Sequence, residues 1–162
     1  MASTVTEPDM PSEVAPLLAR AQVAPKHVTI LLVEDEEFVG HVTSEVLAFA
    51  GYRMLCARHA AEAMRIFRQY EEDVQLLLTD VVLPGRNGHD LARDLRIVRP
   101  ALKIMFISGY PEDAATKCGS QEPGVIHLPK PFSVESLMRT VEQILAEDGI
   151  AEKSKAKSAA RK

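Results

Sequence analysis

The sequence predicts a doubly wound α/β fold in which a five-stranded parallel sheet is flanked by five helices. Two observations lead to this prediction. Short apolar runs recur along the chain, and such runs suit strands that are buried on both faces. Segments with helical apolar spacing alternate with these runs. Because crossovers between parallel strands are right-handed, this alternation places helices on both faces of one sheet.

Five segments are the predicted strands. Three of them are nearly unbroken apolar runs and two are weaker, and in chain order they are residues 28–33, 53–57, 74–78, 104–107 and 125–128. Their lengths are those of ordinary strands, and their continuity indicates burial on both sides.

Four further segments have apolar residues that share one helical face. These sets are Phe38, Val42, Val46 and Phe49; Ala63, Phe67 and Tyr70; Leu91, Leu95 and Val98; and Val134, Leu137, Met138, Val141, Ile144 and Leu145. Gly51, Pro100 and Gly149 are predicted to end the first, third and last of these helices. Residues 111–118 are predicted as a short fifth helix that is poorly amphipathic.

The composition favours one globular domain with a tail at each end. The chain has 162 residues, 46% of them hydrophobic and 26% charged. Residues 1–26 contain four prolines and few bulky apolar residues, and we expect a disordered tail there. Residues 27–147 are the expected folded domain, which is acidic. Residues 148–162 are rich in lysine and are expected to form a solvated basic tail.

Composition also excludes several classes of protein. No apolar run approaches the ~18 residues that a membrane-spanning helix needs. The N-terminus lacks the basic and apolar regions of a secretory signal, so a cytoplasmic location is expected. Cys56 and Cys118 form neither a disulfide framework nor a zinc knuckle. The net charge of −4 does not suggest direct DNA binding.

Polar residues stand where the predicted strands end. The first strand is followed by Glu34 and Asp35, the third by Asp80, the fourth by Ser108 and the fifth by Lys130. In a parallel α/β sheet, these carboxyl ends lie at one edge, where ligands bind. Three carboxylates, one hydroxyl and one ammonium are therefore expected to gather there.

Clustered carboxylates repel one another unless a cation is present, and Mg²⁺ with carboxylate and water ligands fits this set best. The backbone carbonyl of Val82, two residues after Asp80, could add a ligand. A carboxylate beside Mg²⁺ and an ammonium can accept a phosphoryl group and form an acyl phosphate. Lys130 would then neutralise charge on the transferring oxygens, and the Ser108 hydroxyl could hydrogen-bond the product.

Four motifs in this order resemble the receiver domain of bacterial response regulators, most closely the receivers of hybrid histidine kinases. They are ILLVEDE (residues 30–36), LTDVVLPGRNG (78–88), FISGY (106–110) and LPKPF (128–132). The resemblance covers about residues 28–145 and implies a flavodoxin-like receiver sandwich. Each motif alone is weak, but all four at the family's spacing are highly specific.

The resemblance also implies a role for each site residue. Asp80 would be the phosphoacceptor, Asp35 would bind Mg²⁺ directly, Glu34 would act through water, and the Val82 carbonyl would complete the protein ligands. Ser108 and Lys130 would stand at the positions of the family's switch hydroxyl and its lysine. His127 departs from the Tyr or Phe that many members carry at a second switch position, and Glu34 departs from the usual Asp.

The implied function is that of a single-domain response regulator that takes its phosphoryl group from a histidine kinase and then changes its protein contacts. Such a chain catalyses its own phosphorylation and slow dephosphorylation without being a conventional turnover enzyme. Three alternatives stay open. They are a phosphorelay intermediate that passes the group to a phosphotransfer protein, a phosphate sink for a hybrid kinase, and a binding module that works without phosphorylation. A phosphatase is disfavoured because Val82 stands where such enzymes carry a second acid.

Overall fold

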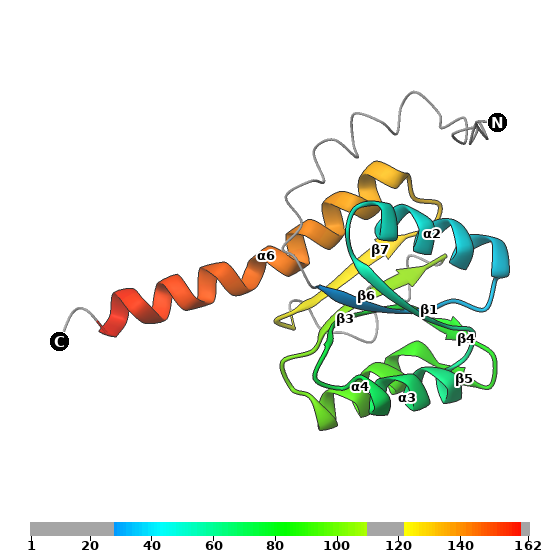
Figure 1. Ribbon diagram of the computed structural model, residues 1–162, viewed down its shortest axis with the longest axis horizontal. Coiled ribbons are helices and arrows are strands. Elements are labelled where there is room, and N and C mark those ends of the chain that lie inside the picture. Colours follow the sequence, from blue (N-terminus) through cyan, green and yellow to red (C-terminus); the bar gives the residue numbers. More distant parts are fainter. Residues whose placement is uncertain (1–27, 110–121, 160–162) are drawn as a thin grey trace, which may run out of the picture.

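The computed structural model describes residues 28–109 and 122–159, with side chains described as far as residue 146 (Figure 1). Its centre is a parallel sheet in the strand order β2-β1-β3-β6-β7. The strands are β1 (Thr29–Val33), β2 (Arg53–Ala57), β3 (Val74–Asp80), β6 (Lys103–Ser108) and β7 (Val125–Pro129). All five predicted strands are confirmed, and the doubly wound α/β fold is confirmed with them.

Four described helices cover the two faces of the sheet. They are α2 (Glu37–Phe49), α3 (Ala60–Gln69), α4 (Gly88–Val98) and α6 (Val134–Ala159). Helices α2 and α6 lie on one face, and α3 and α4 lie on the other (Figure 1). The short helix predicted at 111–118 lies outside the described residues.

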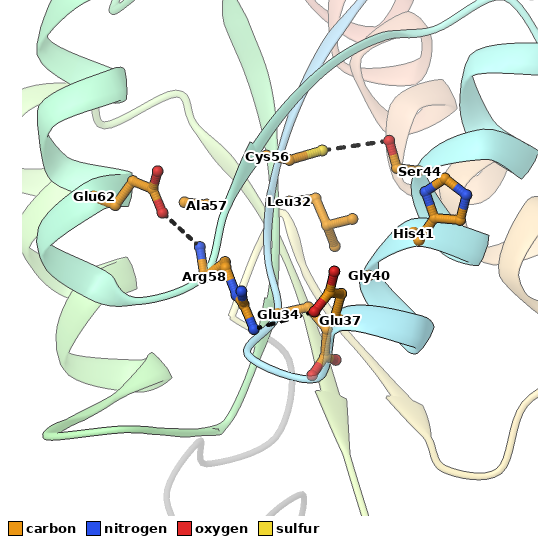
Figure 2. Close-up of a pocket in the computed structure, with 10 residues that line it drawn as sticks. All are labelled: Leu32, Glu34, Glu37, Gly40, His41, Ser44, Cys56, Ala57, Arg58 and Glu62. Atoms are coloured by element: carbon orange, nitrogen blue, oxygen red, sulfur yellow. Dashed lines mark hydrogen bonds and ion pairs between the residues drawn. The ribbon is translucent and has the colours of Figure 1, made fainter.

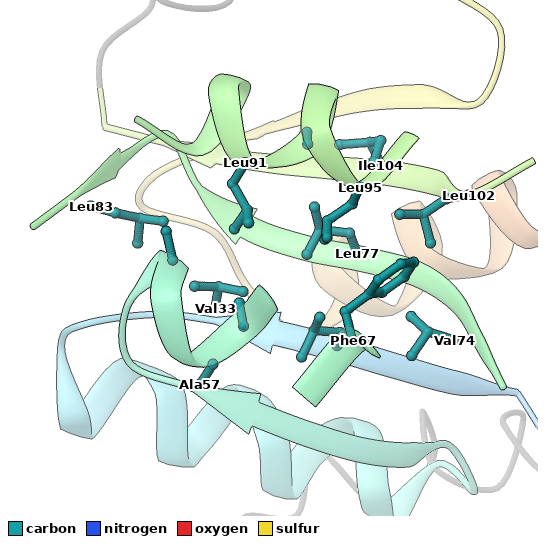
Figure 3. Packing of buried hydrophobic residues seen from close by; sticks show 14 of the residues in the cluster. Val33, Ala57, Phe67, Val74, Leu77, Leu83, Leu91, Leu95, Leu102 and Ile104 are labelled. Atoms are coloured by element: carbon teal, nitrogen blue, oxygen red, sulfur yellow. The ribbon is translucent and has the colours of Figure 1, made fainter. Parts of the chain in front are cut away.

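The continuous apolar strands supply two separate cores. In β1, Leu32 faces the core under α2 and α6, while its neighbour Leu31 faces the core under α3 and α4. Leu78 and Leu77 divide in the same way on β3, because successive side chains of a strand point to opposite faces. Figure 3 shows the second core, where α3 and α4 pack onto the sheet.

The predicted buried face of α2 is wrong for three of its four residues, since only Val46 packs against the core. Phe38, Val42 and Phe49 are 75%, 39% and 64% exposed, and the buried residues of this helix are Thr43 and Leu47. Apolar residues occur on both sides of α2, and the sheet takes the side that carries Leu47. Val98 was likewise predicted to be buried, but it is the last residue of α4 and is 55% exposed.

The predicted end of the last helix at Gly149 is also wrong, because α6 continues through Gly149 to Ala159. A glycine inside a helix costs only about 1 kcal/mol relative to alanine. The residues that follow are mostly Ala, Lys and Glu, which are strong helix formers. Part of the predicted basic tail therefore has a helical backbone, and it extends away from the sheet (Figure 1). Among the described residues, no helix is apolar over enough of its length to cross a bilayer.

The two sides of α2 predict opposite effects on stability. Replacing the fully buried Leu47 by alanine is expected to lower the free energy of unfolding by about 2–5 kcal/mol, because it leaves a cavity under the helix. Replacing the exposed Phe49 by alanine should change it by less than about 0.5 kcal/mol. Urea denaturation of both variants tests this, and equal losses would contradict the assigned faces.

Candidate functional site

Residues from three strand ends meet at the carboxyl edge of the sheet. Glu34 follows β1, Asp80 ends β3 and Lys130 follows β7. The Lys130 Nζ lies 2.7 Å from Asp80 Oδ2 and 3.3 Å from Glu34 Oε2, although these partners are 50 and 96 residues away in the sequence. The structure therefore joins the predicted ammonium to two of the three predicted carboxylates.

The third carboxylate completes an acidic cluster. One carboxylate oxygen each from Glu34, Asp35 and Asp80 lie within 4.8 Å of one another. Glu34 and Asp80 are buried, with 4% and 8% exposure, while Asp35 is exposed. The donors are all hard oxygens, and the exposed side leaves room for water ligands. These residues fit Mg²⁺, which prefers one or two carboxylates and several waters.

Burial has opposing consequences for the charges in the cluster. Burial raises the pKa of the Glu34 carboxyl above its usual value, although the Glu36 backbone N–H, 3.0 Å from Glu34 Oε1, and the Lys130 charge both oppose this shift. Burial lowers the pKa of Lys130, but the hydrogen bond to Asp80 and the charges of Glu34 and Asp80 outweigh it, so this pKa is raised overall. The ammonium therefore stays charged, and it holds the carboxylates together.

The raised pKa of Glu34 predicts a pH dependence of stability in the absence of metal. The folded state binds the Glu34 proton more tightly than the unfolded state, so stability falls as pH rises above about 4.5. In Glu34→Gln this contribution is missing. The free energy of unfolding of the natural chain minus that of Glu34→Gln should therefore decrease between pH 4.5 and 7. Urea denaturation across this range in EDTA measures it, and a constant or rising difference would contradict the account.

Asp80 is fixed by its local backbone. Its Oδ1 accepts a hydrogen bond from the Val82 N–H at 3.0 Å, while Oδ2 accepts from Lys130. Two short strands follow, β4 (Val82–Leu83) and β5 (Arg86–Asn87), which form a hairpin around Pro84 and Gly85. This connection returns the chain to the start of α4, directly beside Asp80.

Gly88 is the residue that allows this close return. A Cβ added at Gly88 would overlap the carbonyl oxygen of Asp80 and lie 3.2 Å from the Cα of Val81. The Gly88 N–H also donates to the Val81 carbonyl at 2.8 Å. From the sequence alone, the Asn87-Gly88 pair indicates only a turn. The requirement for glycine comes from the approach of two backbones, which the sequence does not reveal.

Ser108 and Val82 stand at the rim of the cluster. Ser108 ends β6, is 5% exposed, and its carbonyl accepts a hydrogen bond from the Lys130 N–H at 2.7 Å. The position next to it in β6, Ile107, pairs with Asp80 of β3. Val82 is 61% exposed. The hydroxyl-bearing residue is therefore placed close to both the acid and the lysine.

His127 lies in a cluster of three rings. One of them is Phe106, which pairs with His127 and stands two residues before Ser108 in β6. The His127 ring stacks on Phe106 with a centroid distance of 5.1 Å, and His89 lies 4.2 Å from Phe106 and 6.1 Å from His127. Both ring nitrogens of His127 are buried and lack a hydrogen-bond partner among the described residues. Burial, reinforced by His89, lowers the pKa of His127, so the imidazole is neutral at pH 7. Sequence reasoning missed this cluster because its members lie on three separate elements.

A pocket adjoins the acidic cluster between α2 and β2 (Figure 2). Glu34 lines it, together with charged side chains that pair with one another. Arg58 approaches Glu37 at 3.8 Å, and its backbone N–H donates to Glu62 at 2.9 Å. Cys56 is exposed and donates to the Ser44 hydroxyl at 3.3 Å. Cys118 lies outside the described residues.

Comparisons with known proteins point to one family. A sequence model of the response regulator receiver domain matches residues 30–142. The chain is 38% identical over 117 residues to the sensor kinase CckA of Brucella abortus, and the match covers 72% of the chain but only 12% of the kinase. It is 35% identical over 116 residues to the response regulator receiver protein CpdR of the same organism, covering 72% of the chain and 95% of CpdR.

The solved structures agree with the sequence relatives. The crystal structure of the receiver domain from the hybrid histidine kinase CckA matches with a TM-score of 0.63 and 36% sequence identity. This match covers 72% of the chain and 98% of that domain. The residues that the family model matches, 30–142, include the three acids of the cluster and Lys130.

Proposed function

Because the chain belongs to the response regulator receiver family, we propose that Asp80 accepts a phosphoryl group from a phosphohistidine of a histidine kinase. One observation carries the proposal: the Lys130 ammonium lies 2.7 Å from Asp80 Oδ2, beside the two other carboxylates of the acidic cluster. This arrangement supplies a nucleophile together with a cation that stabilises the transferring oxygens.

In the transfer step, a carboxylate oxygen of Asp80 forms a bond to phosphorus. The bond between phosphorus and the donor's imidazole nitrogen breaks, and its electron pair stays on the imidazole, which leaves an acyl phosphate on Asp80. Lys130 stabilises the negative oxygens of the phosphoryl group. Glu34, Asp35 and Asp80 would hold Mg²⁺, with the Val82 carbonyl as a further proposed ligand, and the ion would supply additional charge neutralisation.

Phosphorylation would act as a switch because it places a dianion next to Ser108. We infer that the Ser108 hydroxyl then donates to the phosphoryl group, and that the end of β6 shifts with it. His127 and Phe106 lie directly below on the same face, so the ring cluster is the part of the core that would feel this shift first. A local change in charge would thus alter a protein-binding face.

Two kinds of output fit this switch. The match to 95% of CpdR favours a single-domain regulator that acts by protein contact. The similarity to the receiver of the CckA kinase favours a relay role, in which the group passes on to a phosphotransfer protein or drains from a kinase as into a sink. A binding module that works without phosphate is disfavoured, because Asp80 and Lys130 are in contact.

Acetyl phosphate tests the proposal without a cognate kinase. In Mg²⁺ the chain is expected to gain one phosphoryl group that is stable in acid and labile in base, and EDTA should prevent the gain. Mass spectrometry should show no gain for Asp80→Asn. It should show full labelling for Asp73→Asn, a matched change at an exposed residue that pairs with Arg53. Equal labelling of Asp80→Asn and the natural chain would overturn the assignment.

Mg²⁺ is also expected to stabilise the fold. At a concentration of 100 times its dissociation constant, a ligand of the folded state adds about 2.7 kcal/mol to the free energy of unfolding. Asp35→Asn should lose most of this gain, whereas Asp73→Asn should keep it. Thermal unfolding with and without Mg²⁺ measures the gain. Equal stabilisation of both variants would place the ion elsewhere.

A further inference from the structure

The β4–β5 hairpin carries the Val82 carbonyl, the further ligand proposed for Mg²⁺, and no other strand of the described chain pairs with it. Each of its two strands has only two residues. A two-stranded hairpin is only marginally stable by itself in water. Contacts with the rest of the domain must therefore fix the position of this hairpin, and with it the position of the Val82 carbonyl.

Arg86 makes contacts of this kind from β5. Its guanidinium donates a hydrogen bond to a carboxylate oxygen of Asp94 in α4, and its other terminal nitrogen lies 3.5 Å from the sulfur of Met64 in α3. The Arg86 and Asp94 side chains are 35% and 28% exposed. Apart from the pairs of Lys130, this is the only ion pair of the described residues in which both side chains are less than half exposed. Salt screens such a partly buried pair less than an exposed one, so the pair can hold the hairpin in place.

The pairing within the hairpin links Arg86 to Val82. Arg86 lies opposite Leu83, and residues that are directly opposite in an antiparallel pair have their side chains on the same face. Leu83 is 7% exposed and packs in the core under α3 and α4 (Figure 3), whereas Val82 is 61% exposed. Leu83 and Arg86 therefore anchor one face of the hairpin, the first by apolar packing and the second by its charge. The Val82 carbonyl belongs to the same planar peptide group as the Leu83 N–H, so a shift of the anchored pair turns this carbonyl.

We propose that Arg86 is a positioning residue for the Mg²⁺ site, which holds the β4–β5 hairpin and its Val82 carbonyl in place through Asp94 and Met64. The inference rests on the proposed function and deepens it. In this role Arg86 acts through Val82 and makes no contact with the reacting groups. A guanidinium suits the role because its separate N–H groups can reach a carboxylate and a second partner at the same time.

A magnesium titration followed by amide NMR tests this role in the full chain. Arg86→Met removes the charge but keeps an unbranched apolar side chain. It should raise the dissociation constant for Mg²⁺ by about 10-fold, the lower end of the usual effect of removing a group that orients a metal ligand. Asp94→Asn should raise it to a similar extent. Because the two residues act as one tie, the double variant should also show about 10-fold, rather than the roughly 100-fold that independent contributions would give.

Arg93→Met is the matched control for the loss of an arginine. Arg93 approaches the other carboxylate oxygen of Asp94 at 3.9 Å, but it belongs to α4 and is 68% exposed. Its replacement should leave the dissociation constant unchanged. Circular dichroism and urea denaturation in EDTA show whether each variant is folded and how stable it is. Asp94→Asn keeps the size of the side chain, so it carries the test if Arg86→Met does not fold.

The outcomes separate this inference from the proposed function. Lower stability in EDTA with an unchanged dissociation constant would assign Arg86 a purely structural role and overturn the inference alone. Equal weakening in Arg93→Met, or a roughly 100-fold effect in the double variant, would overturn it as well. If the Asp35 and Val82 amides of the natural chain did not respond to Mg²⁺, the metal site of the proposed function would fail, and the inference would fail with it.

Discussion

Gly88→Ala is expected to unfold the site locally and to lower the free energy of unfolding by about 1–3 kcal/mol, the usual cost of overpacking. The added Cβ would overlap the Asp80 carbonyl oxygen and lie 3.1 Å from the Asp80 carbonyl carbon, and both neighbours are backbone atoms that cannot rotate away. To relieve the overlap, the start of α4 must move away from the end of β3. Asp80 would then lose its alignment with Lys130.

Gly109→Ala is the matched control for this change. A Cβ at Gly109 meets no atom of the described residues within 4 Å, so the stability of this variant should be nearly unchanged. Urea denaturation compares the two variants, and acetyl phosphate labelling of Gly88→Ala should be much slower than that of the natural chain. Because alanine has the higher helix propensity, a Gly88→Ala variant that is as stable as the natural chain, or more stable, would contradict the assigned contact.

Lys130→Met is expected to have the second large effect. It leaves the carboxylates of Asp80 and Glu34 side by side without their counter-ion. Removing one partner of such a buried group lowers the free energy of unfolding by roughly 3 kcal/mol. The loss should be smaller near pH 4.5, where Glu34 takes up a proton. Phosphorylation from acetyl phosphate should slow by about 100-fold, the usual cost of removing one group that stabilises developing charge.

Arg139→Met removes a cation of the same chain from an exposed pair with Glu135. Such surface pairs contribute less than about 1 kcal/mol, so this variant should keep both its stability and its labelling rate. Denaturation at pH 4.5 and pH 7, combined with a time course of labelling, separates the two variants. If Lys130→Met resembled Arg139→Met in both measurements, the ammonium would have no role at the site.

The positions of the strands along the chain, and the polar residues that follow them, could be predicted from the sequence because burial on both faces leaves a plain signal. Runs such as residues 74–78 have no polar alternation, and a charged residue directly after such a run, as at Asp80, marks the sheet edge. The fold then brings Glu34, Asp80 and Lys130 together. This convergence follows from the topology of a parallel sheet and needs no detail of side-chain packing.

Four features could not be predicted, each for a physical reason. The prediction of which side of α2 is buried was wrong because that helix has apolar residues on two sides. Only packing against the sheet decides which of the two is buried. Gly149 did not end α6 because the helix propensity of the following residues outweighs the cost of one glycine. The need for Gly88 and the stacking of His127 on Phe106 depend on contacts between distant elements, which no local pattern records.

The identity of the acceptor carboxylate is the central claim, and borohydride reduction tests it most directly. Borohydride reduces an acyl phosphate to an alcohol with release of phosphate, so a phosphorylated aspartate becomes homoserine. After treatment with acetyl phosphate and Mg²⁺, reduction and proteolysis, tandem mass spectrometry should find homoserine at position 80 and unchanged residues at positions 34 and 35. A reduced side chain at position 34 or 35, with Asp80 intact, would contradict the account.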